Sequence, residues 1–362
     1  MRIAFVHEYL NQFGGAERVL QVLSSLYPSA PIYTLIYDRE ATGKVFNDRL
    51  IRTSFLQGIP FASNYHRLFP LLMPLAIEQF DFSEFDIVIS VSSSFAKGII
   101  TKPSTKHLCY CLTPPRFLWD GSQRFMDESE YPRLIKKILP PFVGYLRGWD
   151  LDASMRVDKF ISISNFVKDR VSKYYRRDSD VIYPPINLNN FYISKNIEDY
   201  FFMAGRLVPY KKFDVVIEAF NSLGLKLKIA GIGPEFKKLK SNSGKNIEFV
   251  GLVSDKELAE LYSKSRAFIF PQEEDFGLTP LEAMASGRPV MAYNKGGAAE
   301  TVVENKTGIF FNKQRPDSII ESIRDFNLKE GQFKPTDCRD RSSEFSIEAF
   351  SSKLKNNIDS LI

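Results

Sequence analysis

The chain has 362 residues, of which 44% are hydrophobic and 25% charged, and its formal net charge is +5. This length exceeds what one ordinary hydrophobic core supports and predicts two domains. The composition is that of a soluble globular enzyme, and the small net charge excludes a general binder of polyanions. The chain contains no run of about 18 apolar residues, so no membrane-spanning helix is predicted.

The N-terminus enters a predicted strand directly and lacks the apolar core of a signal peptide, so we expect a cytoplasmic protein. Cys109, Cys111 and Cys338 form a sparse set with an odd number, which is typical of reduced thiols. Cys109 and Cys111 alternate along a predicted strand, where buried core thiols are favoured over a metal site. Because the chain has only three histidines, we expect no metal site, and no cofactor is predicted.

Strands and helices alternate along the chain, which is typical of a mostly parallel α/β sheet. The first series has predicted strands at 2–6, 31–36, 86–91, 107–111 and 160–164, and helices at 14–26 and 165–175. A strand with a Pro-rich joint follows at 181–187. The second series has predicted strands at 200–204, 225–230, 247–250 and 267–271, and helices at 213–223, 235–240 and 254–263. An amphipathic helix is predicted at 346–361.

This order predicts two Rossmann-like domains that face each other across a cleft. We place the N-terminal domain at 1–185 and the C-terminal domain at 186–345. Residues 346–362 are predicted to form a C-terminal helix that packs back on the N-terminal domain. Ligands are expected at the carboxyl ends of the strands, where parallel α/β sheets bind them.

The clearest functional pattern surrounds the loop at Gly277. An apolar strand leads into this loop, a helix follows it, and Glu274 and Glu282 stand eight positions apart across it. The N-terminus of a helix suits a phosphate group, whereas carboxylates repel phosphate and suit hydroxyl groups. The combination indicates a nucleotide diphosphate sugar. Surface carboxylates at a helix start, which are common there, are the alternative for the pair taken alone.

A second pattern follows the strand at 200–204, where Gly205 and Arg206 precede Lys211. An Arg and a Lys five positions apart on such a loop can hold a diphosphate from two directions. A solvated basic loop is the alternative. Glycine pairs at 14–15 and 296–297 also open predicted helices, although the first lacks the spacing of a dinucleotide-binding fingerprint.

These motifs together resemble the GT-B-fold retaining glycosyltransferases, in the large family that includes bacterial mannosyltransferases and sucrose synthase. The likeness rests on the Gly-Arg…Lys and Glu…Glu sets, on Gly-Arg-Pro-Val at 287–290 and on the glycines at 296–297. The segments 14–20, 113–120 and 183–187 are similar to an O-antigen and exopolysaccharide subgroup.

The resemblance implies a role for each matching residue. Arg206 and Lys211 would hold the donor diphosphate and stabilise it as it leaves, and Glu274 would bind a hydroxyl of the transferred sugar; these three form the predicted catalytic set. Glu282 would bind the ribose. The family also implies retention of anomeric configuration through same-face attack, without Mg²⁺. The remaining predicted donor-binding residues are Gly14, Gly15, Gly205, Gly251, Val253, Phe276, Gly277, Leu278 and Thr279.

For the acceptor, we predict a site in the N-terminal domain. His7 follows the first predicted strand, where a packed histidine is the alternative. The subgroup usually has a histidine where this chain has Leu112. The identity of the donor sugar is therefore left open. The predicted acceptor-binding residues are His7, Glu8, Arg116, Trp119 and Asp120.

Basic and apolar residues are interleaved between 133 and 177, which suits a helix lying on an anionic membrane surface. Solvated helix faces over a core are the alternative. No nucleic-acid motif accompanies the basic residues, so nucleic acid is not an expected partner.

The predicted function is transfer of a hexose to a lipid-linked oligosaccharide during synthesis of O-antigen, capsule or exopolysaccharide. The predicted donor is GDP-mannose, with a UDP-sugar as the alternative, and the predicted location is the inner face of the cell membrane. An epimerase or phosphorylase of the same shape would lack the Gly-Arg…Lys and Glu…Glu set. A catalytically silent sugar- or membrane-binding scaffold would be expected to have lost one of the four charged residues of this set. They are Arg206, Lys211, Glu274 and Glu282, and all four are present.

Overall fold

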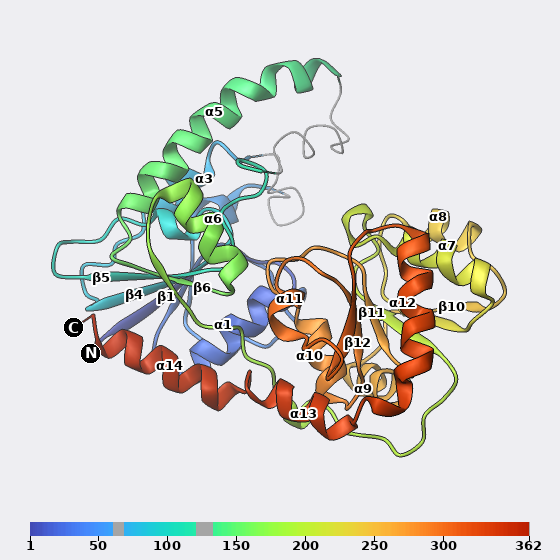
Figure 1. The fold of residues 1–362 in the computed structure, drawn as a ribbon. Coiled ribbons are helices and arrows are strands. Elements are labelled where there is room, and N and C mark those ends of the chain that lie inside the picture. The colour runs from blue at the N-terminus through green and yellow to red at the C-terminus, as the bar shows by residue number, and fades with distance from the viewer. Residues whose placement is uncertain (61–68, 121–132, 362) are drawn as a thin grey trace. The chain divides into compact units, whose positions relative to one another are not determined.

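The computed structural model of the protein describes residues 1–60, 69–120 and 133–361. The chain divides into two compact units (Figure 1). Unit 1 consists of Met1–Tyr183 and Ser351–Ile362, and unit 2 of Pro184–Phe350. The division falls inside the Pro-rich joint that the sequence predicts.

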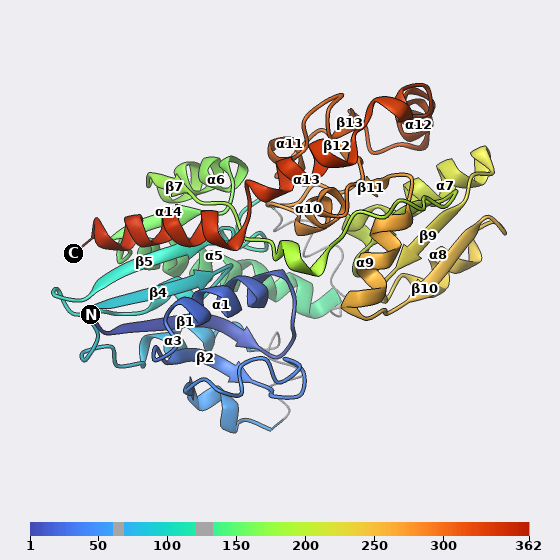
Figure 2. The same ribbon diagram turned by 90° about the horizontal axis from the view of Figure 1, so that it is seen from below.

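Unit 1 is built on a 7-stranded sheet in the order β3-β2-β1-β4-β5-β6-β7, and every pair of neighbours is parallel. Helices α1 and α14 cover one face of the sheet, and α3 and α5 cover the other (Figures 1 and 2). Because both faces are covered, β1 and β4 are almost entirely buried. The strands are β1 Ile3–Leu10, β2 Ile32–Tyr37, β3 Ile51–Thr53, β4 Ile87–Ser92, β5 Lys106–Cys111, β6 Lys159–Ser162 and β7 Ser179–Val181. The helices are α1 Gly15–Leu26, α3 Met73–Glu78, α5 Arg133–Met155, α6 Asn165–Tyr175 and α14 Ile347–Asp359, with 3-10 turns at Phe55–Gly58 and Ala96–Gly98.

Unit 2 has a 6-stranded parallel sheet in the order β10-β9-β8-β11-β12-β13. Alternate side chains of β8 enter opposite faces: Phe201 packs against Phe220 and Phe326, whereas Phe202 packs against Tyr262. The strands are β8 Phe201–Ala204, β9 Leu227–Ala230, β10 Ile247–Gly251, β11 Phe268–Phe270, β12 Val290–Tyr293 and β13 Gly308–Phe311. The helices are α7 Phe213–Leu223, α8 Phe236–Ser241, α9 Asp255–Lys264, α10 Leu278–Ala285, α11 Ala298–Thr301, α12 Pro316–Lys329 and α13 Pro335–Ser343, with 3-10 turns at Leu188–Asn190, Pro209–Lys211 and Glu330–Gln332.

The predicted α/β class is confirmed, and most predicted elements lie within a few residues of the observed ones. The first strand is longer than predicted, since β1 continues to Leu10, which pairs with Tyr37 of β2. His7 and Glu8 therefore lie inside a buried strand rather than after its end. No element was predicted for β3, α3, β12, β13, α12 or α13.

A buried ion pair joins four segments of unit 1. Lys97 donates to Asp150 of α5 and to the carbonyl oxygen of Ser94 (2.7 Å). The second carboxylate oxygen of Asp150 accepts from Trp119 Nε1 (2.8 Å) and from the Tyr175 hydroxyl of α6 (2.9 Å). Every oxygen of Asp150 is therefore bonded, as a buried charge requires. The pair connects α5 and α6 to the loop at 113–120, which carries three of the predicted acceptor residues.

Within the described residues, no helix has the length and apolar character that crossing a membrane requires.

Candidate functional site

The predicted donor residues gather at one edge of the sheet in unit 2. Gly205 follows β8, Gly231 follows β9, and Gly251 ends β10. The loop that carries Glu274 follows β11, and Gly296 follows β12. Since all these strands are parallel, their carboxyl ends share one edge, which is where open α/β sheets bind ligands.

Glycines allow the loops at this edge to stack. A Cβ atom on Gly231 would lie 2.0 Å from the carbonyl oxygen of Gly205, and one on Gly296 would lie 2.4 Å from that of Glu274. The Gly297 N–H donates to the same Glu274 oxygen (2.9 Å). Any side chain at Gly231 or Gly296 would therefore push apart the loops that carry the charged residues.

Lys211 and Glu274 form an ion pair at the centre of this edge. Lys211 Nζ lies 3.0 Å from Glu274 Oε1, which also accepts from Gln272 Nε2 at 3.4 Å. Burial lowers the pKa of Lys211, but the carboxylates of Glu274 and Glu282 outweigh burial, and the pKa is raised. Lys211 is therefore firmly cationic. Gly205 permits this position, because a Cβ there would lie 3.0 Å from Lys211 Nζ.

Helix α10 begins beside this pair, at Gly277. Gly277 has φ 86°, and a Cβ on it would lie 2.8 Å from the ring of Phe270. The first turn of the helix has no acidic residue, so its partial positive charge is not neutralised from within. Leu278 and Thr279 belong to this turn, and Phe276 is buried just before it. The turn can hold an anion through its backbone N–H groups.

Glu282 lies in the second turn of α10 and is buried. The hydroxyl of Tyr262, which is buried on α9, donates to Glu282 Oε2 at 2.9 Å. Tyr262 thus orients the carboxylate predicted to bind the ribose. Neither Tyr262 nor Gln272 was predicted, because a tyrosine on an amphipathic helix has the same pattern as a core aromatic.

The remaining donor candidates are more open. Arg206 is exposed, and no partner for its guanidinium occurs among the described residues. Gly251 has φ 77°, and Val253 is half-buried beside Leu252, whose side chain is 77% exposed. Arg206 is therefore free to take a new anionic partner, whereas Lys211 would have to share its charge between Glu274 and a ligand.

In unit 1, the structure buries His7 and Glu8. His7 donates from Nδ1 to the carbonyl oxygen of Val91 (2.9 Å), and its Nε2 lies 3.6 Å from Glu17 Oε1. Glu8 Oε1 accepts from four donors in the turn after β4, while Oε2 has no hydrogen-bond partner. The four donors are the Ser92 hydroxyl and the N–H groups of Ser93, Ser94 and Ala96. Both residues thus organise the end of the sheet, and their predicted contact with an acceptor stays a prediction.

Glu17 occupies part of the glycine turn predicted to meet the diphosphate. Its Oε2 accepts from the Gly14 N–H at 2.7 Å, so this donor is already used. Gly15 begins α1 and is exposed. Burial raises the pKa of Glu17, but His7 and the Gly14 N–H outweigh burial and lower it. The negative charge of Glu17 is therefore balanced by His7.

Helices α5 and α6 hold the loop that carries Trp119 and Asp120. Arg170 donates to Asp120 and to the carbonyl oxygen of Pro114 (3.0 Å), and Arg147 donates to the carbonyl oxygen of Leu118 (2.8 Å). The indole ring of Trp119 also stacks on Tyr174, with the ring centroids 4.9 Å apart. Arg116 of the same loop is partly exposed, and Leu112 just before it is buried.

Comparison with known proteins bears on the identity of the chain. Residues 190–343 match the family model described as glycosyl transferases group 1. Alpha-1,3/1,6-mannosyltransferase ALG2 of Rhizomucor pusillus is 25% identical over 278 residues, covering 74% of this chain and 56% of the relative. O-antigen chain mannosyltransferase RfbU of Salmonella typhimurium is 31% identical over 155 residues, covering 38% and 42%. The chain spans about half the length of the curated relatives it matches.

Solved structures extend the likeness over both units. Anabaena Alr3699/HepE in complex with UDP superposes with a TM-score of 0.73 over 99% of this chain and 100% of that chain, at 15% identity. Sucrose-phosphate synthase from Thermosynechococcus elongatus also has a TM-score of 0.73 and 15% identity, over 99% of each chain. At a sequence identity of 15%, the structural similarity shows the fold and not the activity. The chain has the GT-B fold, and its residues 190–343 match the glycosyl transferases group 1.

The family match also covers the candidate site. Its residues from Gly205 to Gly297 all lie within the matched segment, whereas the predicted acceptor residues lie outside it. Among the described residues, no group of three His, Cys, Asp or Glu side chains is placed to hold a metal ion.

The three thiols of the protein are free and buried. The neighbouring Cys109 and burial raise the pKa of Cys111 well above its ordinary value. Burial raises the pKa of Cys338 to about 12. The expectation of buried core thiols is confirmed.

The charge on His7 predicts a pH-dependent stability. Burial lowers the pKa of His7, but Glu17 and Glu8 outweigh burial and raise it. The stabilisation by protonated His7 is complete below the ordinary histidine pKa of about 6.5 and is lost as the pH rises through the raised value. The difference in unfolding free energy between wild type and His7→Gln should therefore shrink between about pH 6 and pH 9, by at most about 1.4 kcal/mol per pH unit.

Both tryptophans, Trp119 and Trp149, belong to unit 1, so denaturation followed by tryptophan fluorescence reports on the unit that contains His7. His107 affects the stability in a separate pH range. Burial lowers its pKa to about 3, so its contribution to the unfolding free energy changes only below about pH 6.5. A difference that stays constant from about pH 6 to pH 9 would show that His7 is not charged in the folded protein.

Proposed function

We propose that the protein is a retaining glycosyltransferase that moves a hexose from a nucleotide diphosphate sugar to a lipid-linked glycan. The observation that carries this proposal is the Lys211–Glu274 pair beside the start of α10. A cation, a helix N-terminus and a carboxylate within one sheet edge suit a diphosphate and a sugar hydroxyl together.

In the proposed reaction, the bond between the sugar C1 atom and the diphosphate oxygen breaks, and the diphosphate leaves with the electron pair. Lys211, Arg206 and the N–H groups of α10 stabilise the growing negative charge, and this requires no metal ion. A hydroxyl oxygen of the acceptor forms the new bond to C1 on the same face, and its proton passes to the departing phosphate. Glu274 orients the sugar, and Glu282 holds the ribose.

Relatives support a mannose donor for this chain. ALG2 and RfbU are mannosyltransferases, and a 34% identical relative over 136 residues, from Mycobacterium tuberculosis, is named as GDP-mannose-dependent. We therefore propose GDP-mannose as donor. The HepE structures contain UDP and UDP-glucose, which supports a UDP-sugar as the second candidate.

The proposed acceptor is lipid-linked, in the synthesis of O-antigen, capsule or exopolysaccharide, at the inner face of the cell membrane. Exposed apolar side chains of α5 support membrane contact, and Tyr145 and Met155 are 59% and 64% exposed. Phe142 and Leu151 of the same helix are also exposed. Side chains of this kind enter the boundary of a bilayer readily.

The basic residues between 133 and 177 support this contact less than the sequence suggested. Several of these basic side chains bond to other groups within unit 1. Lys168, Lys173 and Arg176, in α6 and at its end, are exposed. Arg133, Lys136 and Lys137 lie outside the residues whose side chains the structure describes. The cations bonded within unit 1 are Arg147, Arg156, Lys159, Arg170 and Arg177.

Removing the charge of Lys211 should abolish most of the turnover. We expect Lys211→Met to lower the rate of nucleoside diphosphate release in the presence of a lipid-linked glycan by roughly 10²–10³-fold, as for loss of one charge-stabilising group. The exposed Lys237→Met on α8 is the matched control and should retain the wild-type rate. Equal rates in Lys211→Met and Lys237→Met would show that Lys211 does not take part in the reaction.

A thermal-shift screen should identify the donor. GDP and GDP-mannose are expected to raise the melting temperature with or without Mg²⁺, because a ligand at about 100 times its Kd stabilises the native state by about 2.7 kcal/mol. Glu282→Gln should reduce this shift. A shift with UDP-sugars alone would show that the donor is a UDP-sugar and not GDP-mannose. The absence of a shift with any nucleotide would favour a catalytically silent scaffold.

Vesicle sedimentation should test the membrane contact. Replacing Phe142 and Tyr145 by serine should weaken binding to anionic phospholipid vesicles by about tenfold or more, since burial of one large apolar side chain contributes about 1.5–3 kcal/mol. Leu328→Ser is the control, because Leu328 is 84% exposed but lies in unit 2. Binding that is unchanged in the double variant would exclude α5 as the contact.

A further inference from the structure

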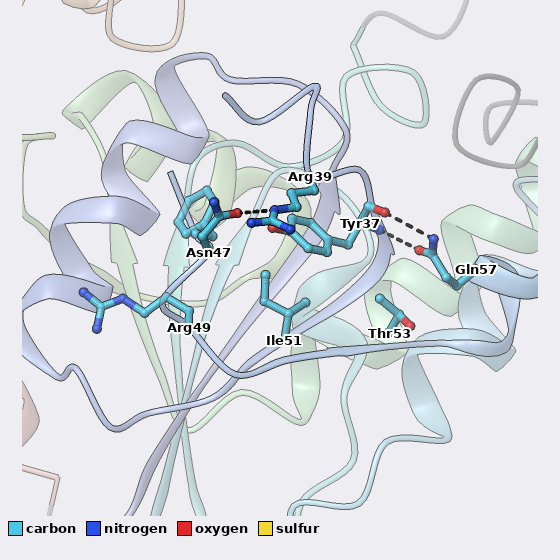
Figure 3. A pocket seen from close by; sticks show the side chains of 8 residues that line it. Tyr37, Arg39, Asn47, Arg49, Ile51, Thr53 and Gln57 are labelled. Carbon is cyan, nitrogen blue, oxygen red and sulfur yellow. Dashed lines mark hydrogen bonds between the residues drawn. The ribbon is translucent and has the colours of Figure 1, made fainter. Parts of the chain in front are cut away.

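A hollow of about 520 Å³ lies in unit 1 where β2 and β3 end (Figure 3). Tyr37 is the last residue of β2 and Thr53 the last of β3, and both line the hollow. It therefore occupies the kind of position where parallel sheets bind ligands, and its size is within the range of small-molecule sites. None of the residues assigned to donor or acceptor above lines it.

The polar groups of the hollow are held in place by hydrogen bonds. Gln57 accepts from the Tyr37 N–H (2.8 Å) and donates to the Tyr37 carbonyl oxygen (3.2 Å). Arg39 donates from Nε to Asn47 Oδ1 at 2.8 Å, which fixes the plane of its guanidinium (Figure 3). A ligand would meet a prearranged set of groups, which lowers the entropy cost of binding.

The hollow carries positive charge without a matching carboxylate. The two terminal guanidinium nitrogens of Arg39 have no partner among the described residues. Arg49 contributes only its stem, because its guanidinium points away and donates to the carbonyl oxygen of Pro28 (3.0 Å). Of the acidic residues nearest in sequence, Asp38 accepts from the backbone at 40–41 and Glu40 pairs with Lys44 at 3.3 Å. Asp48 is exposed and does not line the hollow.

We propose that this hollow binds a phosphorylated sugar. The terminal nitrogens of Arg39 form the planar fork that suits two oxygens of a phosphate. The half-buried ring of Tyr37 offers an apolar face beside a hydroxyl, which suits a sugar ring, and Asn47, Thr53 and Gln57 offer hydrogen bonds to hydroxyl groups. A volume of about 520 Å³ exceeds what a phosphate alone would fill.

The sheet register connects the hollow to the predicted acceptor site. Tyr37 of β2 pairs with Leu10 of β1, the strand that carries His7 and Glu8. The hollow and these candidates thus lie on adjacent strands of one sheet. Resting on the proposed function, we assign the hollow to the diphosphate and first sugar of the lipid-linked acceptor.

Equilibrium binding tests this assignment without any donor. The soluble probe is N-acetylglucosamine 1-phosphate, the lipid-linked probe is decyl diphospho-N-acetylglucosamine, and free N-acetylglucosamine and inorganic phosphate are the reference ligands. Arg39→Gln should weaken binding of the decyl probe by roughly 10- to 100-fold, as expected for loss of a charge-assisted hydrogen bond. Tyr37→Leu should weaken it as well. Arg52→Gln on β3 is the matched control, because Arg52 bonds to Tyr33 (2.7 Å) outside the hollow.

The expected result is wild-type affinity in Arg52→Gln, weak affinity in Arg39→Gln, and tighter binding of the decyl probe than of any soluble ligand. Equal affinities in Arg39→Gln and wild type would overturn the site. Soluble sugar phosphate that binds as tightly as the decyl probe would overturn its assignment to the acceptor. Because no donor is present, these outcomes are separate from a failure of nucleoside diphosphate release, which bears on the proposed transfer reaction itself.

Discussion

Close approach between backbone segments is the constraint on which the candidate donor site depends. The loop after β9 lies against the loop after β8, and the turn at Gly296 lies against the backbone of Glu274. At these contacts a Cβ atom would come within 2.4 Å of a carbonyl oxygen. The first contact fixes the start of the loop that leads to Lys211, and the second fixes the backbone of Glu274.

The Lys211–Glu274 pair has a particular consequence for a ligand. With Arg206 exposed and Lys211 already neutralised by Glu274, the edge of the sheet is less positive than its lysines and arginines suggest. A diphosphate that takes Lys211 frees Glu274 to accept hydrogen bonds from a sugar. The two parts of a nucleotide diphosphate sugar would thus complete each other's binding site, whereas a bare phosphate would leave Glu274 without its cation.

The sequence predicted the clustering of the candidate donor residues at one sheet edge better than it predicted the rest of the molecule. Gly205, Lys211, Glu274 and Glu282 follow strands of a parallel sheet, and strand ends meet whatever the details of packing. Tyr262 could not be predicted, because its bond to Glu282 depends on how α9 packs against α10. The same limit applies to the fold, where the short edge strand β3 and the later strands β12 and β13 were not predicted.

The basic segment from 133 to 177 illustrates a different limit. A count of charges cannot distinguish a cation that faces water from one that bonds to a distant backbone. Arg147 and Arg170 bond to carbonyl oxygens of the loop at 113–120, and only the tertiary structure brings that loop to α5 and α6. Similarly, His7 was expected after the end of a strand, but pairing of β1 with β2 and β4 extends the strand past it.

The burial of all three thiols makes the native protein suitable for site-directed labelling. Cys109, Cys111 and Cys338 are at most 1% exposed. The thiolate is the species that attacks maleimide reagents, and burial disfavours the thiolate. One cysteine introduced at an exposed position, such as that of Lys168, would carry a spin label or fluorophore without prior removal of the native cysteines. Paired labels on unit 1 and unit 2 would then measure the separation of the two units in solution, with and without a nucleotide.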